Sequence, residues 1–181
     1  ILGYANNGVQ KITNITTNLS INAANTKVGG VVGYVENSTF ECSQFTVNTN
    51  QFAINGNSYI GAIAGKTYNS GFSISDVSIN HIMTERDKDV LVIYATNQFV
   101  GGIIGCAEQC KESSVSNVLV RTSVGSSGTG SDSDTGKYVG GLIGYCNTSN
   151  KIDICDTKIS GQITGYEYVG GFIGEFIGAE T

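Results

Sequence analysis

Proline and tryptophan are absent from the sequence, and charged residues make up only 14% of its 181 positions. A disordered chain would be rich in charge and poor in aliphatic side chains, whereas 40% of these residues are hydrophobic, so the chain can bury a core. The formal net charge is −5 and the ten lysines and arginines are scattered, which excludes the basic stripe that a nucleic-acid partner requires. No apolar run approaches the roughly 20 residues of a membrane span, so we expect no direct membrane insertion.

Clustered metal ligands are also lacking, because the sequence has one histidine, five scattered cysteines and no Cys-x-x-Cys motif. We therefore expect no metal and no cofactor. Two pairs of cysteines lie close in the sequence, Cys106 with Cys110 and Cys146 with Cys155, while Cys42 stands alone. They are either buried thiols that act as small hydrophobic side chains or local disulfides across turns in an oxidising compartment.

What the sequence does have is a repeated glycine motif of the form Val-Gly-Gly-x-Ile-Gly. It occurs at residues 28–33, 60–65, 100–105, 139–144 and 169–174, and residues 1–3 resemble the end of a sixth copy. The structural glycines of the five copies are Gly29, Gly30, Gly33, Gly61, Gly65, Gly101, Gly102, Gly105, Gly140, Gly141, Gly144, Gly170, Gly171 and Gly174. The last glycines are 30, 32, 40, 39 and 30 residues apart, counted from Gly3. We interpret residues 1–181 as a single repeat array, with repeats of about 1–33, 34–65, 66–105, 106–144 and 145–174.

An alternating apolar segment follows each motif, for example Phe45/Val47 and Val77/Ile79, and this pattern is typical of a half-buried β-strand. Most of the length variation lies in the second half of each repeat, with the longest insertions at 81–98 and 121–137. One repeat cannot bury its apolar residues alone, but repeats stacked about 4.8 Å apart pair every strand with its copies and create a continuous core. The sequence therefore predicts an all-β, parallel β-helix-like solenoid of five to six coils.

The motif itself is expected to be one strand, for instance over residues 138–145, with its glycines where a second layer of backbone approaches closely. Its central apolar residues should form one column along the axis. They are Val31, Ile63, Ile103, Leu142 and Phe172. The residues that precede the motif are aromatic in four copies and could stack as a ladder. They are Tyr59, Phe99, Tyr138 and Tyr168, with Lys27 as the exception.

The motif, with a strand that carries a small or cysteine residue about ten positions later, resembles the GLUG repeat. The resemblance covers essentially all 181 residues, and only the copy at 60–65 departs from the pattern, with Ala62 and Ala64. GLUG repeats occur in large secreted or surface-attached bacterial and protist proteins, including adhesin-like proteins and some immunoglobulin-protease precursors, where they lie outside the catalytic domain. The resemblance therefore implies an extracellular scaffold and assigns no catalytic residue.

Residues for other chemistry are sparse. The acidic side chains that a polysaccharide lyase or hydrolase would need gather only in the two insertions. They are Glu85, Asp87 and Asp89 in the first and Asp132 and Asp134 in the second. We expect His81 to be a solvated loop residue, and residues 131–136 resemble the start of a calcium loop without the carboxylate that would complete it. Rows of threonine, as in ice-binding proteins, are approached only by Thr13, Thr16 and Thr17.

Four N-glycosylation sequons begin at Asn14, Asn18, Asn37 and Asn147. We expect Asn37 and Asn147 in corresponding turns and the other two on a strand. The sequence has seventeen asparagines, so some sequons arise by chance. The same side chains could instead form hydrogen-bonded ladders between coils.

These features favour a non-enzymatic structural or adhesive protein outside the cell or on its surface, such as a rigid stalk, spacer or filament subunit that displays loops on one side. The alternative is a carbohydrate-binding or carbohydrate-cleaving β-helix, which a groove lined by stacked aromatics and acids would favour. Neither end of the chain carries a polar cap, so we expect adjoining repeats or other copies of the chain to cover the ends. Glycans and host or cell-surface proteins are further candidate partners.

Overall fold

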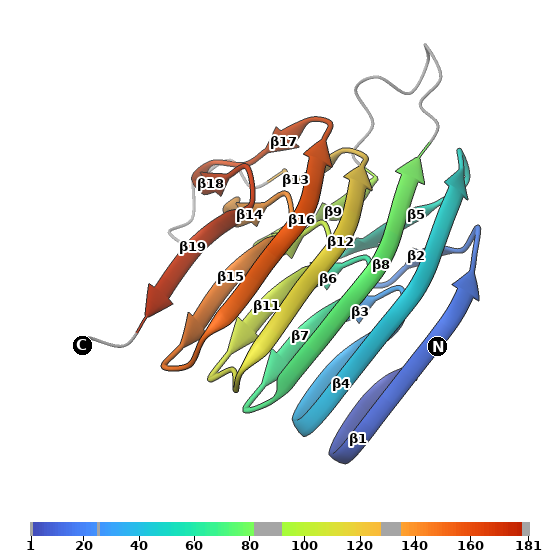
Figure 1. Cartoon of the computed structure of the whole chain (residues 1–181). Coiled ribbons are helices and arrows are strands. Elements are labelled where there is room, and N and C mark those ends of the chain that lie inside the picture. The colour runs from blue at the N-terminus through green and yellow to red at the C-terminus, as the bar shows by residue number, and fades with distance from the viewer. Residues whose placement is uncertain (1, 25, 82–91, 128–134, 179–181) are drawn as a thin grey trace.

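The computed structural model describes residues 2–24, 26–81, 92–127 and 135–178, and within them every regular element is a β-strand. The strands pair in parallel and form three sheets that wrap around one axis (Figure 1). The chain visits the sheets in the same order in each repeat, so each repeat makes one coil and stacks on the coil before it. The protein is therefore an all-β parallel solenoid, as the sequence predicts.

Each sheet collects the equivalent strands of successive coils. Sheet A contains β1 (Leu2–Thr16), β4 (Val32–Thr49), β7 (Ala64–Tyr68), β8 (Gly71–His81), β11 (Ile104–Glu108), β12 (Ser113–Arg121), β15 (Ile143–Thr148), β16 (Ile152–Ser160) and β19 (Ile173–Gly178). Sheet B contains β2 (Ser20–Asn22), β5 (Ala53–Gly56), β9 (Ile93–Ala95), β13 (Val124–Ser126) and β17 (Ile163–Thr164). Sheet C contains β3 (Val28–Gly29), β6 (Ile60–Gly61), β10 (Val100–Gly101), β14 (Lys137–Gly140) and β18 (Glu167–Gly170).

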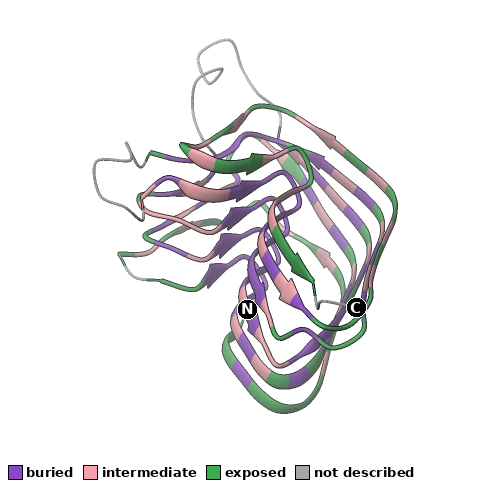
Figure 2. Ribbon diagram, turned by 90° about the vertical axis from the view of Figure 1, so that its left-hand side faces the viewer, coloured by how far each residue is buried: buried purple, intermediate pink, exposed green. Residues whose placement is uncertain are grey.

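Sheet A folds back on itself to form two layers. The first half of β4 pairs with β7, and its second half pairs with β8. In Figure 1 the second half of β4 with β8, β12 and β16 forms one layer, and the first half of β4 with β7, β11, β15 and β19 forms the other. Inward side chains of both layers, such as Val35 and Phe45, are completely buried in a common core. Figure 2 shows this alternation of buried and exposed residues along the long strands.

The central residues of the motif form one column, as predicted. The amide of Val31 donates to the carbonyl of Ile63, Ile63 to Ile103, Ile103 to Leu142, and Leu142 to Phe172, at 2.8–3.1 Å. The expectation of one continuous motif strand is wrong, however. Each motif is split by a bend between a sheet C strand and a sheet A strand, as β14 and β15 are split at residues 141–142. The motif is therefore the corner at which one coil passes into the next.

Three further corners recur in the coils, each with a non-glycine residue at positive φ. The first column is Asn7, Asn37, Asn69 and Gln109; the second is Asn14, Gln44, Asp76, Asn117 and Asp156; the third is Lys27, Tyr59, Phe99, Tyr138 and Tyr168. The first two columns hold amide and carboxylate side chains, which are the non-glycine residues that tolerate this conformation best. The third column holds the residues that precede the glycine motif, four of them aromatic.

The two longest insertions include more regular structure than the sequence suggested, because β9 and β13 lie within them. Their remaining parts, residues 82–91 and 128–134, lie outside the described residues and follow β8 and β13 respectively. The first of these segments thus precedes β9 and the second follows β13, and both of these strands belong to sheet B.

Candidate functional site

The ladder of aromatic rings in the third corner column is confirmed. Tyr59 and Phe99 stack with ring centroids 4.7 Å apart, Phe99 and Tyr138 at 4.7 Å, and Tyr138 and Tyr168 at 5.1 Å, with interplanar angles of 3–5°. The corner backbone aims every ring in the same direction, and the repeat along the axis matches the thickness needed for stacking. Lys27 occupies the same column in the first such corner, and its Nζ lies 4.0 Å from the ring centroid of Tyr34.

A second outward-facing column runs beside the ladder on sheet A. Its members are Tyr4, Tyr34, Lys66, Cys106, Tyr145 and Glu175. Tyr145 packs edge-on against Phe99 and Tyr138, at centroid distances of 5.6 and 5.4 Å. The two columns therefore form one aromatic strip along the solenoid.

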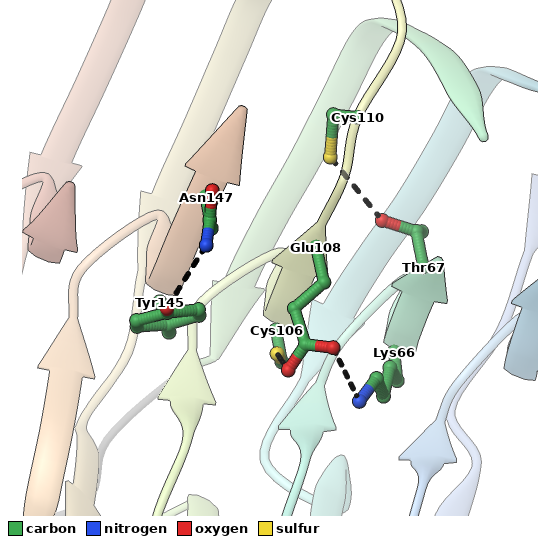
Figure 3. Close-up of polar contacts among 7 residues, drawn as sticks. All are labelled: Lys66, Thr67, Cys106, Glu108, Cys110, Tyr145 and Asn147. Carbon is green, nitrogen blue, oxygen red and sulfur yellow. Dashed lines mark hydrogen bonds and ion pairs between the residues drawn. The ribbon is translucent and has the colours of Figure 1, made fainter. Parts of the chain in front are cut away.

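One ion pair of the strip joins Lys66 to Glu108. Lys66 Nζ lies 2.9 Å from Glu108 Oε2 and 4.9 Å from the ring centroid of Tyr59. Burial lowers the pKa of Lys66, but the hydrogen bond to Glu108 and the neighbouring acidic groups together raise it above its usual value. The thiol of Cys106 donates to the other oxygen of Glu108 at 3.5 Å, and burial raises the pKa of this thiol (Figure 3). The ammonium group is thus charged and already paired.

Stacked aromatics can serve as a sugar-binding platform, but this requires free ring faces. Within the ladder the facing sides of neighbouring rings cover each other, and Tyr145 packs edge-on with Phe99 and Tyr138. Tyr168 is the last ring of the stack, and this residue is 42% exposed. The geometry therefore makes the ladder a packing element that supports the corners, and it offers little surface for stacking a sugar ring.

All five cysteines are free thiols, so neither of the two suggested disulfides is formed in this structure. Cys106 faces the outer strip, whereas Cys110 lies in the core, where its sulfur is 3.9 Å from Thr67 Oγ1 (Figure 3). Cys146 is also in the core, and Cys155 is exposed on β16. The cysteine side chain that contacts Cys110 through a hydrogen bond is Cys146.

The outer face of the long strands of sheet A carries columns of small polar side chains. One column is Thr13, Ser43, Ser75 and Ser116; another is Thr16, Thr46 and Ser78. Ser114 Oγ donates to Ser73 Oγ at 3.3 Å, and a depression of about 280 Å³ lies at the edge of this face, lined by Ser73, Ser114 and Asp153 among others. Only the threonines of the first repeat stand out in the sequence, because they form a row along one strand. Register between repeats is the signal that would have revealed the columns.

The glycosylation candidates occupy different environments. Asn14, Asn18 and Asn37 are exposed, whereas Asn147 is half-buried on β15. Asn147 does not occupy the turn equivalent to Asn37, because it pairs with Glu108 of the preceding coil, one position before that turn. Asn37 accepts a hydrogen bond from Asn69 Nδ2 at 2.8 Å, so it takes part in an inter-coil ladder of the kind considered as the alternative.

Other asparagines form similar ladders. Asn80 Nδ2 donates to Asn48 Oδ1 at 3.0 Å, and Asn117 Nδ2 donates to Asp76 Oδ1 at 2.7 Å. These bonds join equivalent residues of neighbouring coils on the exposed side of the long strands. The asparagine-rich composition therefore contributes to inter-coil pairing.

Candidate catalytic and metal-binding residues do not gather in the described chain. The acidic residues Glu85, Asp87, Asp89, Asp132 and Asp134 lie outside the described residues, as does most of the calcium-loop resemblance. The expectation for His81 is wrong, because it lies at the end of β8 and is 6% exposed. Within the residues described, no group of three or more histidine, cysteine, aspartate or glutamate side chains could hold a metal ion. The same residues include no helix long and apolar enough to cross a membrane.

Comparison with known proteins gives one distant similarity. An alignment 146 positions long covers 77% of this chain and is 29% identical to halomucin from Haloquadratum walsbyi. The alignment spans only 1% of the length of halomucin. No family model matches the chain, so the resemblance to GLUG repeats stays a prediction. No solved structure matches it.

Proposed function

We propose that this chain is a structural repeat segment of an extracellular or cell-surface protein, in which it acts as a rigid stalk or spacer, and that it has no catalytic activity. The observation that carries the proposal is the uninterrupted register of the coils. Backbone hydrogen bonds, the glycine corners and the aromatic ladder each repeat in a straight column along the axis. Such an array is stiff along its length because every coil is bonded to both neighbours.

The ends of the solenoid suggest how the array is extended. Val139, Leu142 and Cys146 are completely buried, yet their counterparts in the last described coil, Val169, Phe172 and Phe176, are 44%, 44% and 53% exposed. Leu2 and Tyr4 are similarly exposed at the other end. A further coil would bury these side chains and pair the free edge strands. We propose that adjoining repeats, or a second copy of the chain, supply it.

An extracellular or surface location is supported by two features. The similarity to halomucin is compatible with it, and so is the resemblance of the glycine motif to GLUG repeats. Adhesion and glycosylation would follow from such a location. The exposed sequons at Asn14, Asn18 and Asn37 are the positions at which glycans would attach.

Carbohydrate binding by the aromatic strip is the alternative, and the covered ring faces argue against it. Glycan-array screening of the intact chain checks this point. Binding that is lost in Tyr168→Ala and retained in Ser73→Ala would favour the alternative, because Tyr168 carries the ring face at the end of the ladder.

Sedimentation of the 181-residue chain over a range of micromolar concentrations tests end-to-end extension. We expect elongated assemblies that grow with concentration and appear as rods in negative stain. Phe172→Lys should abolish this growth, because it places a charge on the apolar end, whereas Ser73→Lys on the exposed side face should not. A chain that stays monomeric at all concentrations would contradict self-association, and a flexible shape in small-angle scattering would contradict the rigid stalk.

A further inference from the structure

Two buried thiols from neighbouring coils face each other in the core. Cys110 lies in the turn between β11 and β12, and Cys146 lies on β15 of the next coil. Both side chains are completely buried and belong to the hydrophobic core. The equivalent positions in the preceding coil hold Ser70 and Ala107, so the fold does not require cysteine at either position.

The backbone segments that carry these residues are hydrogen-bonded to each other. Ala107 is the direct strand partner of Cys146, and the amide of Cys110 donates to the carbonyl of Asn147 at 3.4 Å. Thr148 Oγ1 donates to the carbonyl of Cys110 at 2.7 Å and fixes the turn against β15. Thr67 and Cys146 both pair with Ala107, from the coils on either side of it, and the Cys110 sulfur lies 3.9 Å from Thr67 Oγ1, so it reaches the column of inward side chains to which Cys146 belongs.

We propose that Cys110 and Cys146 form a disulfide that joins two successive coils when the protein folds in an oxidising environment. The oxidant is a small-molecule disulfide such as oxidised glutathione. The thiolate of Cys110 attacks it and forms a mixed disulfide, which releases one glutathione thiol. The thiolate of Cys146 then attacks the Cys110 sulfur and releases the second. Two protein thiols are oxidised, and one glutathione disulfide is reduced to two thiols that take up both protons.

The two sulfurs have different surroundings in the folded chain. The hydrogen bond from Cys146 outweighs the effect of burial and, with the bond from Thr67, lowers the pKa of Cys110. The hydrogen bond to Cys110, together with burial, raises the pKa of Cys146. Cys110 is therefore the thiol that ionises first.

The other cysteines are poorly placed to compete. Cys106 lies on the outer face of β11 and donates to Glu108, so its side chain is on the opposite side of the strand from the core. Cys155 is exposed on β16, in the other layer of sheet A. The pairs suggested by nearness in sequence, Cys106 with Cys110 and Cys146 with Cys155, thus each combine a core thiol with an outward one.

Peptide mapping identifies the pair directly. The full chain is refolded with oxidised glutathione, the remaining thiols are alkylated, and the protein is digested with trypsin under denaturing conditions. Cys106 and Cys110 then share the peptide 89–111, Cys146 lies in 138–151, and Cys155 lies in 152–158. Further cleavage after Glu108 separates Cys106 from Cys110. We expect 138–151 to be linked to the fragment 109–111.

Three results would overturn the proposal. They are a link between 138–151 and 89–108, a link between 138–151 and 152–158, and complete alkylation of Cys110 and Cys146 after oxidative refolding. A melting temperature about 5–10 °C higher for the oxidised chain, reversed by a reductant, is the expected accompaniment. Cys110→Ser should lose both the link and the shift. The matched variant Cys106→Ser should keep both, and the reduced forms of the two variants report any effect of the substitutions on folding.

Discussion

At the scale of single residues, the glycines of the motif are required because backbone atoms occupy the space of a side chain. A Cβ on Gly140 would lie 2.0 Å from the carbonyl oxygen of Ile143, in its own corner, and a Cβ on Gly144 would lie 2.5 Å from the carbonyl oxygen of Gly105, in the preceding coil. No side-chain rearrangement relieves a contact with backbone. The close approach therefore comes from the corner and from neighbouring coils, where the sequence analysis expected a separate layer.

Gly141 and Gly171 form a matched pair for testing this. A Cβ on Gly141 would lie 2.2 Å from the carbonyl oxygen of Gly171 and 2.6 Å from Ile159 Cγ2, whereas a Cβ on Gly171 would meet nothing within 4 Å. Ala62 occupies the same column, so the corner accepts one methyl group but not a branched side chain. We expect Gly141→Val to cost about 3 kcal/mol and Gly171→Val less than about 1 kcal/mol in urea unfolding. Equal costs would contradict the close approach.

The aromatic corner residues combine backbone strain with favourable stacking. Tyr138 has φ of 59°, which costs a non-glycine residue about 1 kcal/mol, while ring stacking contributes about 0.5–1.5 kcal/mol per pair. Tyr138→Gly should therefore be less destabilising than Tyr138→Ala, because glycine removes the strain and alanine keeps it. At Tyr145, which has no positive φ, the order should reverse. The melting temperatures of the four variants give the comparison. If the alanine variant has the higher melting temperature at both positions, backbone strain at Tyr138 is ruled out.

The sequence pattern predicted the aromatic column, but it did not reveal the corner at Asn14 or the burial of His81. The column of Tyr59, Phe99, Tyr138 and Tyr168 was visible because the rings recur at a fixed distance from a strong motif. The corner at Asn14 was concealed, because its column contains asparagine, glutamine and aspartate, which share a tolerated conformation rather than a recognisable side chain. The burial of His81 depends on contacts made across the coil, which sequence spacing does not report.

At the scale of strands, the aromatic strip lies along the junction between sheets C and A. Burial raises the pKa of Tyr59, Tyr138 and Tyr145, and it raises the pKa of Tyr34 to about 12. The neutral phenols are thus favoured by the folded state. The free energy of unfolding should therefore decrease when the pH becomes alkaline enough to ionise these tyrosines.

The direction of this linkage can be tested. A tyrosine in the unfolded chain ionises near pH 10, so the stabilisation is complete below about pH 10 and is lost as pH rises toward 12 through the raised pKa values. We expect the urea midpoint to fall as the pH rises above about 10. The variant with Tyr59, Tyr138 and Tyr145 replaced by phenylalanine should lose less, since Phe99 already occupies the ladder without a hydroxyl group. An identical decline in both proteins would exclude the tyrosines as its cause.

Strand boundaries were predictable only where alternation was clear. The long strands β8 and β12 follow from apolar positions two residues apart, such as Val77 and Ile79. The break between β14 and β15 was not predicted, because the period-two pattern of a strand continues through the sequence of residues 138–145. Two adjacent glycines followed by an apolar residue describe a strand and a sharp corner equally well. Only the fully buried Leu142 at the bend distinguishes them.

At the scale of the whole molecule, the repeat was enough to predict the parallel stack. Because every coil carries the same motif, pairing equivalent strands in register buries the apolar residues of all copies. The contacts between coils were less accessible. The facing of Cys110 and Cys146 depends on a turn that is one residue longer in this coil than in the coil before, and this shifts which side chains meet. Predicting contacts between side chains of successive coils therefore requires the strand register between the coils, which can be read from the sequence only approximately.

A one-dimensional stack also predicts how stability is distributed. Each coil is held by its two neighbours, so the middle coils should open least often and the end coils should fray. In hydrogen exchange at a concentration where the chain is monomeric, we expect the slowest amides in the column at Ile63 and Ile103, which donate to the next coil at 3.0 and 2.9 Å. Leu2, whose amide makes a bond of the same length, should exchange much faster because it lies in an end coil.

Phe172→Lys separates this behaviour from global unfolding. The substitution should accelerate exchange at Leu142, whose amide donates to Phe172, and leave Val31 at the other end unchanged, because coupling passes only between adjacent coils. Equal acceleration at both positions, or uniform protection in the unsubstituted chain, would show that the solenoid opens as one cooperative unit. That result would contradict a modular stalk whose length can grow by adding coils without changing those already present.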